Sequence, residues 1–461
     1  MRPSFVALRQ HNFRLWAAGN LVSVTGTWMQ VLGVNWLVLS TTGSATKMGA
    51  VVLLQSTPVL LLGPFGGALA DRLPARPLLV ASQTIHAGLA LLLAFASTSG
   101  FGGINAIYAI VIAGGVVSAV DGPAMGRFGS TVVAPEHLGN ALALGSTVNS
   151  AGRILGMSVG GVLVATIGPA PLFVANAVSF IAVIGSLFAM RLKALVNLIP
   201  PSVPENALRA VRSGLKYIAS EPCVLIAFGL SFVLGSLGRN YQVTMGAMSA
   251  GPLQAGAGGY GALSTAFAIG GVLGGLLAAG QRDMSYRFLA GIGLTGSVLQ
   301  VASGVMPNLW TFGLLMLSVA ATAVIIDTVV STRAQLDTRG EMRGRVLSLL
   351  AAISSLAGAV GAPVLGWMSE TLGPRACLII AGTVCSATCV GAAMYINRVR
   401  ETCPAPPAPE PDLVADHLEP AADPVLSADP VGGAVARPTG ELNAGEHHVP
   451  AAPVHTRSGA R

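Results

Sequence analysis

The chain is short of charge. Charged residues make up 10% of its 461 residues and aromatic residues 5%, whereas hydrophobic residues make up 52% and the mean hydropathy is +0.69. An average soluble domain carries about 25% charged residues, so too little polar surface is present here to cover a soluble core. The 58 glycines also favour a membrane protein, because small residues let transmembrane helices approach one another closely.

Signatures of metal sites and of nucleotide hydrolysis are lacking as well. The five cysteines form no C-x-x-C pair, and the sequence contains no nucleotide-binding P-loop. These absences argue against a metal centre and a primary ATP-driven pump, and we expect neither an enzymatic activity nor a bound cofactor. The net charge of +7 is spread over many short segments, so it does not indicate a nucleic-acid partner.

What the chain has in place of charge is a series of long apolar stretches. An α-helix needs about 20 residues to cross a hydrocarbon core about 30 Å thick. The stretches are continuous, which excludes a transmembrane β-barrel with its strands of about 10 alternating residues. We therefore predict an all-α polytopic membrane protein with twelve transmembrane helices. The expected spans are residues 13–40, 47–69, 77–98, 104–126, 138–165, 168–190, 222–248, 259–281, 286–306, 308–332, 344–368 and 373–396.

The basic residues predict how these spans are oriented. Of the 26 Lys and Arg residues, 19 fall on the segments that share a side with the N-terminus, and only Lys47 and Arg375 fall in the loops of the other side. Cytoplasmic loops carry the excess of Lys and Arg in membrane proteins. Both termini are therefore expected in the cytoplasm, with the chain in the cell membrane, and we expect a monomer.

The spans and the segments between them predict four parts. The segment 191–221 contains Leu208, Val211, Leu215 and Ile218 at helical spacing, with basic residues on another face, which predicts either an amphipathic helix on the membrane surface or a solvated linker helix. After residue 396 the composition changes to Pro, Ala, acidic residues and His, which predicts disorder. The parts are an N-terminal six-helix bundle (1–190), a cytoplasmic linker (191–221), a C-terminal six-helix bundle (222–396) and a disordered cytoplasmic tail (397–461).

The two expected bundles repeat one another. A shift of 206 residues superposes Asp121 on Asp327 and Arg127 on Arg333, and a shift of 212 residues superposes Asp71 on Asp283. The two copies lie six spans apart, so they have the same orientation in the membrane. Parallel repeats with a substrate site between them are typical of transporters that work by alternating access.

The segment between the second and third spans has the sequence Gly67-Ala-Leu-Ala-Asp71-Arg72-Leu-Pro-Ala-Arg76. It resembles the G-x-L-a-D-R-x-G-R-K signature of the major facilitator superfamily, with Pro74 and Ala75 in place of the glycine and the first basic residue. The resemblance implies the major facilitator fold of two pseudo-symmetric six-helix bundles. It also implies an inner gate that favours the outward-facing state and breaks in each cycle. The gate residues would be Gly67, Asp71, Arg72, Arg76 and Asp121.

Physical reasons support such a gate. A carboxylate at Asp71 can interact with the positive N-terminal end of the helix expected from residue 344, and Asp121 is a possible partner for the two arginines. A weaker second copy of the gate would consist of Asp283, Arg287 and Asp327. The alternative is that the arginines only anchor a loop on the inner side.

The fifth span contains closely spaced glycines. Gly152, Gly156, Gly160 and Gly161 resemble the g-x-x-x-G-P-x-x-G-G signature of exporters in the superfamily, with Met157 in place of the proline. Small residues at a spacing of four create a groove for close helix contact. Packing alone explains this pattern as well as antiport does.

Longer stretches narrow the resemblance. Residues 13–16 and 26–30, Asp121-Gly-Pro-Ala, Asn176-Ala-Val-Ser-Phe and Glu341-Met-Arg-Gly-Arg-Val resemble the enterobactin-exporter-like branch of the twelve-span drug:H+ antiporters. This resemblance implies export of a small amphiphilic molecule such as a drug, a siderophore or a secondary metabolite. An importer or facilitator with the same fold is the alternative, and a non-transporting membrane sensor is a more remote one.

Polar residues at helical spacing predict the cavity. Burying a guanidinium in a membrane costs at least about 2.5 kcal/mol, so Arg153 and Arg239 should face either a wet cavity or a carboxylate, and such a cavity would favour neutral or anionic cargo. The predicted substrate cavity consists of Asn20, Thr27, Gln30, Asn149, Arg153, Arg239 and Gln242.

The sequence leaves several candidates for the residue that couples transport to its energy source. The proton gradient is the expected one, but the first span has no carboxylate. The candidates for a proton carrier are Asp121, Asp327, Glu136 and His86, and uniport stays open.

Overall fold

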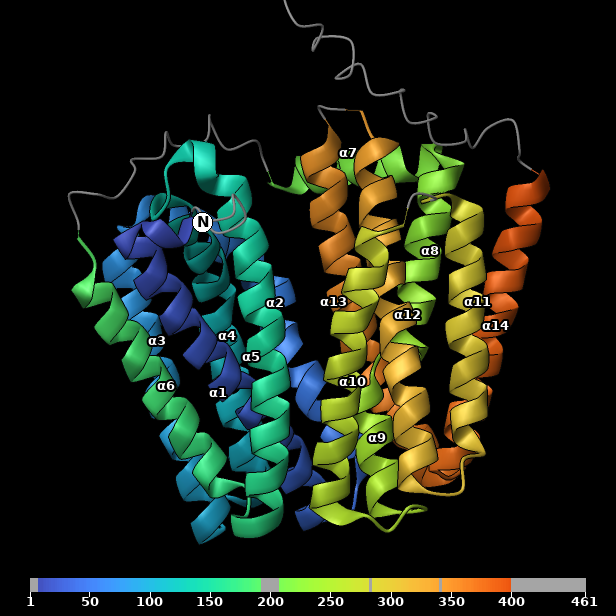
Figure 1. Cartoon of the computed structure of the whole chain (residues 1–461), viewed down its shortest axis with the longest axis horizontal. Coiled ribbons are helices and arrows are strands. Elements are labelled where there is room, and N and C mark those ends of the chain that lie inside the picture. The colour runs from blue at the N-terminus through green and yellow to red at the C-terminus, as the bar shows by residue number, and fades with distance from the viewer. Residues whose placement is uncertain (1–6, 192–206, 282–283, 340–341, 399–461) are drawn as a thin grey trace, which may run out of the picture. The chain divides into compact units, whose positions relative to one another are not determined.

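The computed structural model of the chain describes residues 7–191, 207–281, 284–339 and 342–398, all of which belong to one compact unit (Met1–Pro406). Fourteen α-helices and no strand occur among these residues (Figure 1). The tail beyond residue 398 and Asp283 lie outside the described residues. The first six helices are α1 (His11–Thr42), α2 (Ala45–Arg72), α3 (Ala75–Ser99), α4 (Gly103–Thr131), α5 (Leu138–Ile167) and α6 (Ala170–Ala189). The others are α7 (Ala207–Ser220), α8 (Pro222–Leu237), α9 (Tyr241–Ala250), α10 (Gly256–Ala279), α11 (Tyr286–Gly304), α12 (Leu309–Leu336), α13 (Arg343–Thr371) and α14 (Pro374–Arg398).

The helices form two six-passage groups with the same internal pairing. In the first group α1 packs on α5 and α6, α3 packs on α4 and α6, and α2 packs on α4. In the second group α8 packs on α13 and α14, α11 packs on α12 and α14, and α10 packs on α12. Each pair of one group has its counterpart in the other, so the predicted pseudo-symmetric bundles are confirmed.

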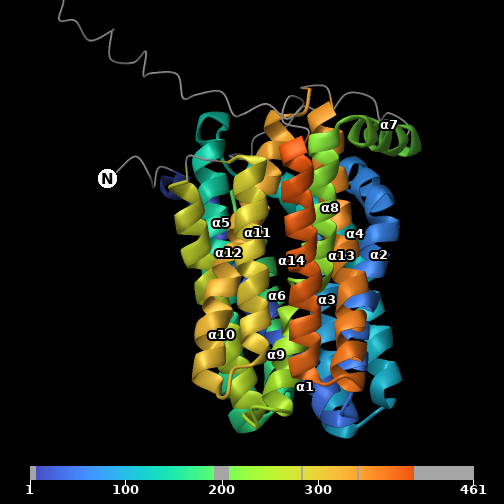
Figure 2. The same ribbon diagram turned by 90° about the vertical axis from the view of Figure 1, so that its right-hand side faces the viewer.

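Hydropathy identifies eleven of the twelve passages among the described residues. Eleven helical segments are long and apolar enough to cross a membrane, with Pro222–Ala250 counted as one. α11 is not among them, because Arg287, Gln300 and several glycines lower its hydropathy. It nevertheless runs beside α12 and α14 in both views (Figures 1 and 2) and packs on both.

The seventh passage is broken, whereas the sequence predicts one continuous span over 222–248. α8 ends at Leu237 and α9 begins at Tyr241. Asn240 stabilises the end of α8, since its Nδ2 atom donates hydrogen bonds to the carbonyl oxygens of Gly235 (3.2 Å) and Ser236 (2.9 Å). Asn240 therefore satisfies two of the backbone carbonyls freed at the break, as a break inside a membrane requires.

α7 lies crosswise to the other helices at one end of the molecule (Figure 2), which we call the α7 end. It is attached to the second group, because Gly214 packs closely on Leu349 and Arg345 donates a hydrogen bond to Ser213 Oγ (2.9 Å). Val211 and Leu215 are exposed. The side chains of Leu208 and Arg209 lie outside the described part of the chain.

The two groups meet most closely at the opposite end, which we call the far end. α2 packs on α13 and α5 on α10, two contacts that correspond to one another in the repeat. Glycines make both contacts possible: a Cβ atom on Gly161 would lie 2.5 Å from the Cα atom of Gly261, and one on Gly49 would lie 2.3 Å from the carbonyl oxygen of Ala362. The ribbons of the two groups diverge from there towards the α7 end (Figure 1).

Candidate transport cavity

A cavity of ≈ 270 Å³ lies between the two groups of helices. It receives side chains from α1, α2 and α5 of the first group, and from the α8–α9 break, α9 and α10 of the second. Its lining contains two arginines, aromatic rings and methionines but no carboxylate. The lining residues are Trp28, Val52, Arg153, Met157, Arg239, Asn240, Tyr241, Gln242, Val243, Met245 and Phe267.

Arg239 has a charged partner. It lies in the α8–α9 break, and its guanidinium forms an ion pair with the carboxylate of Asp327 on α12. The Arg239 side chain is 18% exposed and that of Asp327 58%. The pair reduces the electrostatic cost of the Arg239 charge, because a carboxylate in contact offsets much of the lost hydration.

Arg153 has no such partner. Its guanidinium lies 5.9 Å from the ring centroid of Trp28, and no ion pair is formed by Arg153 with the described residues. Its Nε atom is buried and has no hydrogen-bond partner within that part of the chain. Gly271 on α10 makes room for it, since a Cβ atom there would lie 2.6 Å from Nη2.

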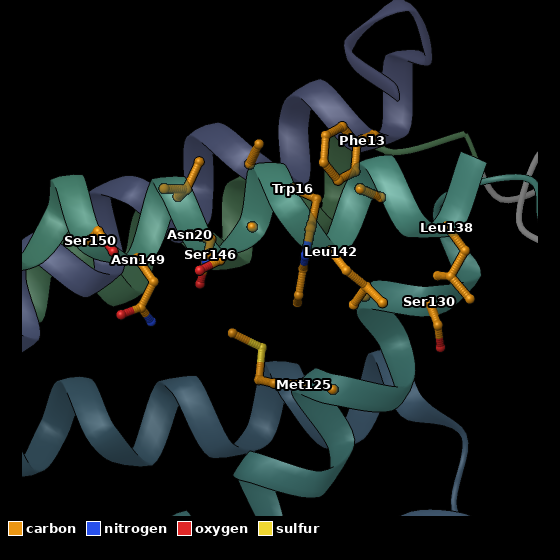
Figure 3. A pocket seen from close by; sticks show the side chains of 16 residues that line it. Phe13, Trp16, Asn20, Met125, Ser130, Leu138, Leu142, Ser146, Asn149 and Ser150 are labelled. Carbon is orange, nitrogen blue, oxygen red and sulfur yellow. The ribbon is translucent and has the colours of Figure 1, made fainter. Parts of the chain in front are cut away.

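A second cavity, of ≈ 470 Å³, lies nearer the α7 end, since its lining comes from the start of α1, the end of α4 and the start of α5. Figure 3 shows its lining side chains. α1, α4 and α5 form its walls. Asn20, Ser146 and Asn149 supply polar groups, while Trp16 and Met125 supply apolar ones. A polar face on α1 and α5 thus continues from the central cavity towards the α7 end.

Contacts between the two groups close the far end. Asn35 on α1 donates hydrogen bonds to Gln242 Oε1 (3.1 Å) and to the Tyr260 hydroxyl (3.5 Å). Thr46 donates through its backbone N–H (3.0 Å) and its hydroxyl (2.6 Å) to the carboxylate of Glu370. These contacts join α1 to α9 and α10, and α2 to α13.

The other residues predicted for the cavity have different surroundings. Gln30 accepts a hydrogen bond from Asn176 on α6 (2.8 Å), inside the first group. Thr27 is exposed and lines neither of the two cavities. Gln242 lines the central cavity and takes part in the far-end contact described above.

The predicted inner-gate residues lie in the parts of their helices nearer the α7 end, but they do not form one cluster. Asp71 and Arg72 are exposed at the end of α2, and Arg76 lies over the ring of Phe188 at 4.9 Å. Asp121 accepts hydrogen bonds from Ser82 and from Gln83 Nε2 (3.1 and 3.2 Å), so its contacts are with α3 rather than with the two arginines.

The residue that links α4 to the end of α2 is Arg127. Its Nη1 atom donates to the carbonyl oxygen of Ala70 (2.5 Å), close to Gly67 and Asp71 in the sequence. A cation is favourable at the C-terminal end of a helix, where carbonyl oxygens lack partners. The repeat had indicated this residue, because it superposes on Arg333.

The second half differs from the first. Asp327, which the repeat superposes on Asp121, pairs with Arg239, and Arg287 donates a hydrogen bond to Asn397 (2.9 Å). The predicted grouping of Arg287 with Asp327 is therefore not formed in this conformation. Arg333 is 2% exposed and pairs with Asp337 (3.0 Å), whose carboxylate also accepts a hydrogen bond from Tyr286 (2.7 Å).

The glycines of the fifth span line helix contacts. Gly152, Gly156 and Gly160 face α1, where a Cβ atom on Gly156 would lie 2.4 Å from the carbonyl oxygen of Thr25. Gly161 faces Gly261 on α10. The motif thus packs α5 both within its own group and across the interface.

Sequence reasoning missed part of the cavity. Trp28, Tyr241 and Phe267 line it but are apolar or aromatic residues within long apolar stretches, so polarity patterns do not identify them. The break before Tyr241 had a usable signal, because glycine-interrupted segments mark binding sites in transporters. Gly235 and Gly238 interrupt the seventh span in this way.

Two similar bundles of six helices with a charged cavity between them form the architecture of a membrane transporter. Comparison with known families agrees. Residues 2–427 match the model of the transmembrane secretion effector family, and the chain belongs to this family of the major facilitator superfamily. Because this is a family of transporters, the chain is a multi-pass membrane transporter, and its family and relatives are transporters rather than enzymes.

Curated relatives share low identity. The chain is similar to the multidrug efflux pump Tap of Mycolicibacterium fortuitum (24% identity over 83% of this chain and 94% of Tap). It is similar to the enterobactin exporter EntS of Shigella flexneri (25% identity over 79% of this chain and 86% of EntS). The match to YfiS, an uncharacterized transporter of Bacillus subtilis, has 23% identity and spans about half of either protein, 45% of this chain and 49% of YfiS.

Solved structures share the fold. A bacterial homolog of the human lysosomal transporter Spinster, solved in an inward-facing and unoccupied conformation, superposes with a TM-score of 0.65. The superposition covers 88% of this chain and 100% of that protein, at 14% sequence identity. At this identity the likeness establishes the fold alone.

Proposed function

We propose that this transporter exports a small amphiphilic molecule across the cytoplasmic membrane by alternating access. The observation that carries the proposal is the central cavity, which is lined by both halves and closed at the far end by contacts such as Asn35–Gln242. Two similar halves around one site can rock so that each end opens in turn. The direction is inferred from Tap and EntS, which are named as exporters.

The orientation follows from the basic residues. The segments at the α7 end carry most of the Lys and Arg, and positive residues favour the cytoplasmic side. With the α7 end in the cytoplasm, a structure closed at the far end is the inward-facing form. It would take up cargo from the cytoplasm or from the inner leaflet.

Proton antiport is the energy source we propose. Asp121 lies on α4 with hydrogen bonds from α3, and the ring of His86 on α3 stacks on Phe180 at 5.3 Å. A carboxylate held within the membrane is favoured as a proton carrier, because the neutral form costs much less to bury there. Asp327 and Glu136 are the other candidates, and uniport is the alternative.

The first experiment is to identify the cargo. Metabolites retained by cells that lack the protein are compared with those of cells that overproduce it, and a compound enriched in the former is then measured in everted membrane vesicles. We expect uptake into these vesicles, with loss of uptake when an ionophore collapses the proton gradient. Transport unaffected by the ionophore would argue against antiport.

Two variants test the site itself. Arg153→Ala and Arg239→Ala should each lower export at least about tenfold, because both charges face the cavity. Full export by both variants would remove the assignment of the cavity.

Other functions are less well supported. An importer or facilitator would share the fold, and uptake into right-side-out cells in place of everted vesicles would favour it. A non-transporting sensor would bind ligand without moving it across the bilayer.

A further inference from the structure

We propose that the cargo is an aromatic anion, whose acidic group is held by Arg153 beside the ring of Trp28. This inference rests on the proposed export function and names the chemical class that the same cavity takes.

The first argument is the balance of charge. The cavity lining contains Arg153 and Arg239 and no carboxylate. Asp327 neutralises Arg239 from outside the lining, so one positive charge is left over at Arg153. An ionised group at membrane depth needs a partner, water or a ligand of opposite sign.

The second argument is the arrangement of hydrogen-bond donors. The guanidinium of Arg153 lies 5.9 Å from the ring centroid of Trp28, and its Nη2 atom lies where a Cβ atom on Gly271 of α10 would come within 2.6 Å. These two neighbours restrict the positions of the guanidinium before any ligand arrives, which reduces the entropy that binding must overcome. A planar guanidinium with free N–H groups matches a carboxylate or a related acidic oxygen pair.

The third argument is the aromatic content of the walls. Trp28 lies on one side of the cavity, and Tyr241 and Phe267 lie on the other. The rings of Tyr241 and Phe267 are tilted against one another, with their centroids 5.0 Å apart. Aromatic rings favour offset-stacked or edge-to-face contacts with another ring. The volume of ≈ 270 Å³ is near the lower end of small-molecule pockets, which span about 300–1,000 Å³. A ligand of one or two fused rings with an acidic substituent fits both features.

The charge of the cargo also has a consequence for energetics. With the α7 end in the cytoplasm, export moves a negative charge towards the positive side of the membrane. A potential of 100 mV then favours export of a monovalent anion by about 50-fold in concentration ratio. A proton carrier in the cavity is not required for this part of the driving force.

The test uses three probes of one shape. Binding of 2-naphthoate, 2-naphthamide and 2-naphthylmethylammonium to the purified full-length protein is measured by titration calorimetry. We expect the carboxylate to bind at least about tenfold tighter than the amide, since charge-assisted hydrogen bonds exceed neutral ones. Equal or tighter binding of the amide or the ammonium compound, or no measurable binding of 2-naphthoate, would overturn the proposal.

Variants show which residue provides the selectivity. Arg153→Gln should reduce the affinity gap, the ratio of the affinity for 2-naphthoate to that for 2-naphthamide, to less than about twofold. Arg153→Lys should keep most of this affinity gap. Arg375→Gln removes a charge at the start of α14, away from the cavity, and should leave the gap unchanged. Trp28→Leu should weaken binding of both the carboxylate and the amide, since it removes a ring contact that the two probes share. A gap that persists in Arg153→Gln would assign the selectivity elsewhere and contradict the proposal.

The test of the ligand class and the test of export can fail independently of one another. The titrations need neither a membrane nor a direction of transport, so selective binding of 2-naphthoate without export would leave the ligand class intact and remove the proposed direction. Export of a neutral or cationic compound, with no preference for 2-naphthoate, would retain the proposed function and remove this inference.

Discussion

Arg239 can keep its charge within the membrane because Asp327 lies against it. Arg239 would not be expected at this depth alone, since its side chain is only 18% exposed and its charge loses much of its hydration there. The pair joins the α8–α9 break to α12 within the second half, while the guanidinium also reaches the cavity. Arg153, across the cavity, has the Trp28 ring and no carboxylate, so the two arginines are not equivalent.

Asp327→Asn should lower the stability of the protein. The variant leaves Arg239 without its counter-charge, and because Asp327 is 58% exposed we expect a cost of about 1–2 kcal/mol, below the 3–5 kcal/mol of a fully buried pair. A lower melting temperature in detergent, by differential scanning fluorimetry, is the measurement.

An exchange of charges provides the control. The double variant Arg239→Asp with Asp327→Arg restores opposite signs and should recover part of the stability that each single change loses. A double variant whose loss of stability equals the sum of the two single losses would show that the ion pair contributes nothing.

At the scale of elements, glycines decide where the two halves touch. α5 and α10 cross at Gly161 and Gly261, and α2 and α13 cross at Gly49 and Gly366. All four lie in the far-end halves of their helices, where a side chain would meet backbone atoms of the opposite helix. Backbone cannot move aside as a flexible side chain can, so these positions control how closely the far end can shut.

Gly161→Leu should open the far end. The added Cβ atom would lie 2.5 Å from the Cα atom of Gly261, and overpacking of this kind costs about 1–3 kcal/mol. We expect faster labelling of a cysteine placed at Thr46 by a membrane-impermeant thiol reagent.

The matched control is Gly291→Leu. Gly291 lies on α11 with open space around it, so this change should leave the labelling rate as it is. Equal rates in both variants would mean that the α5–α10 crossing does not set the closure of the far end.

At the scale of the whole molecule, the repeat explains how one site can open to two sides. The α2–α13 and α5–α10 contacts are equivalent under the exchange of halves. Both contacts can therefore separate together when the two halves rock about the central cavity. This rocking is the motion that alternating access to one site requires. Under the alternating access proposed above, hydrogen bonds such as Thr46–Glu370 would have to break in each cycle.

A covalent link across the far end should stop transport. Thr46→Cys with Glu370→Cys places two thiols where the side chains now form a hydrogen bond of 2.6 Å. Treatment with a short bifunctional thiol reagent should abolish export in vesicles, and reduction of a cleavable linker should restore it. Each single-cysteine parent, treated alike, should retain transport, and a linked protein that still transports would rule out opening at this end.

Much of the architecture could be predicted from the sequence. Apolar stretches of helix length and few charges predicted all twelve passages, including α11, which a hydropathy threshold alone does not find. The shifts of 206 and 212 residues predicted two similar halves. These features are local or periodic, so they can be found without knowing which helices touch.

The cavity could be predicted only in part. Arg153, Arg239 and Gln242, which the sequence assigns to a substrate cavity, line the central cavity of the structure, because a polar residue in an apolar span needs a polar environment. The partner of Arg239, by contrast, is 88 residues away, and the sequence placed Asp327 with Arg287 instead.

The sequence by itself therefore determined that the chain crosses a membrane as two related bundles, since the solvent selects length and polarity one helix at a time. Only the tertiary structure decided which charges are neutralised, where the seventh passage breaks and which end is shut. Those properties depend on distances between helices far apart in the chain, and a repeating pattern of hydropathy carries no information on them.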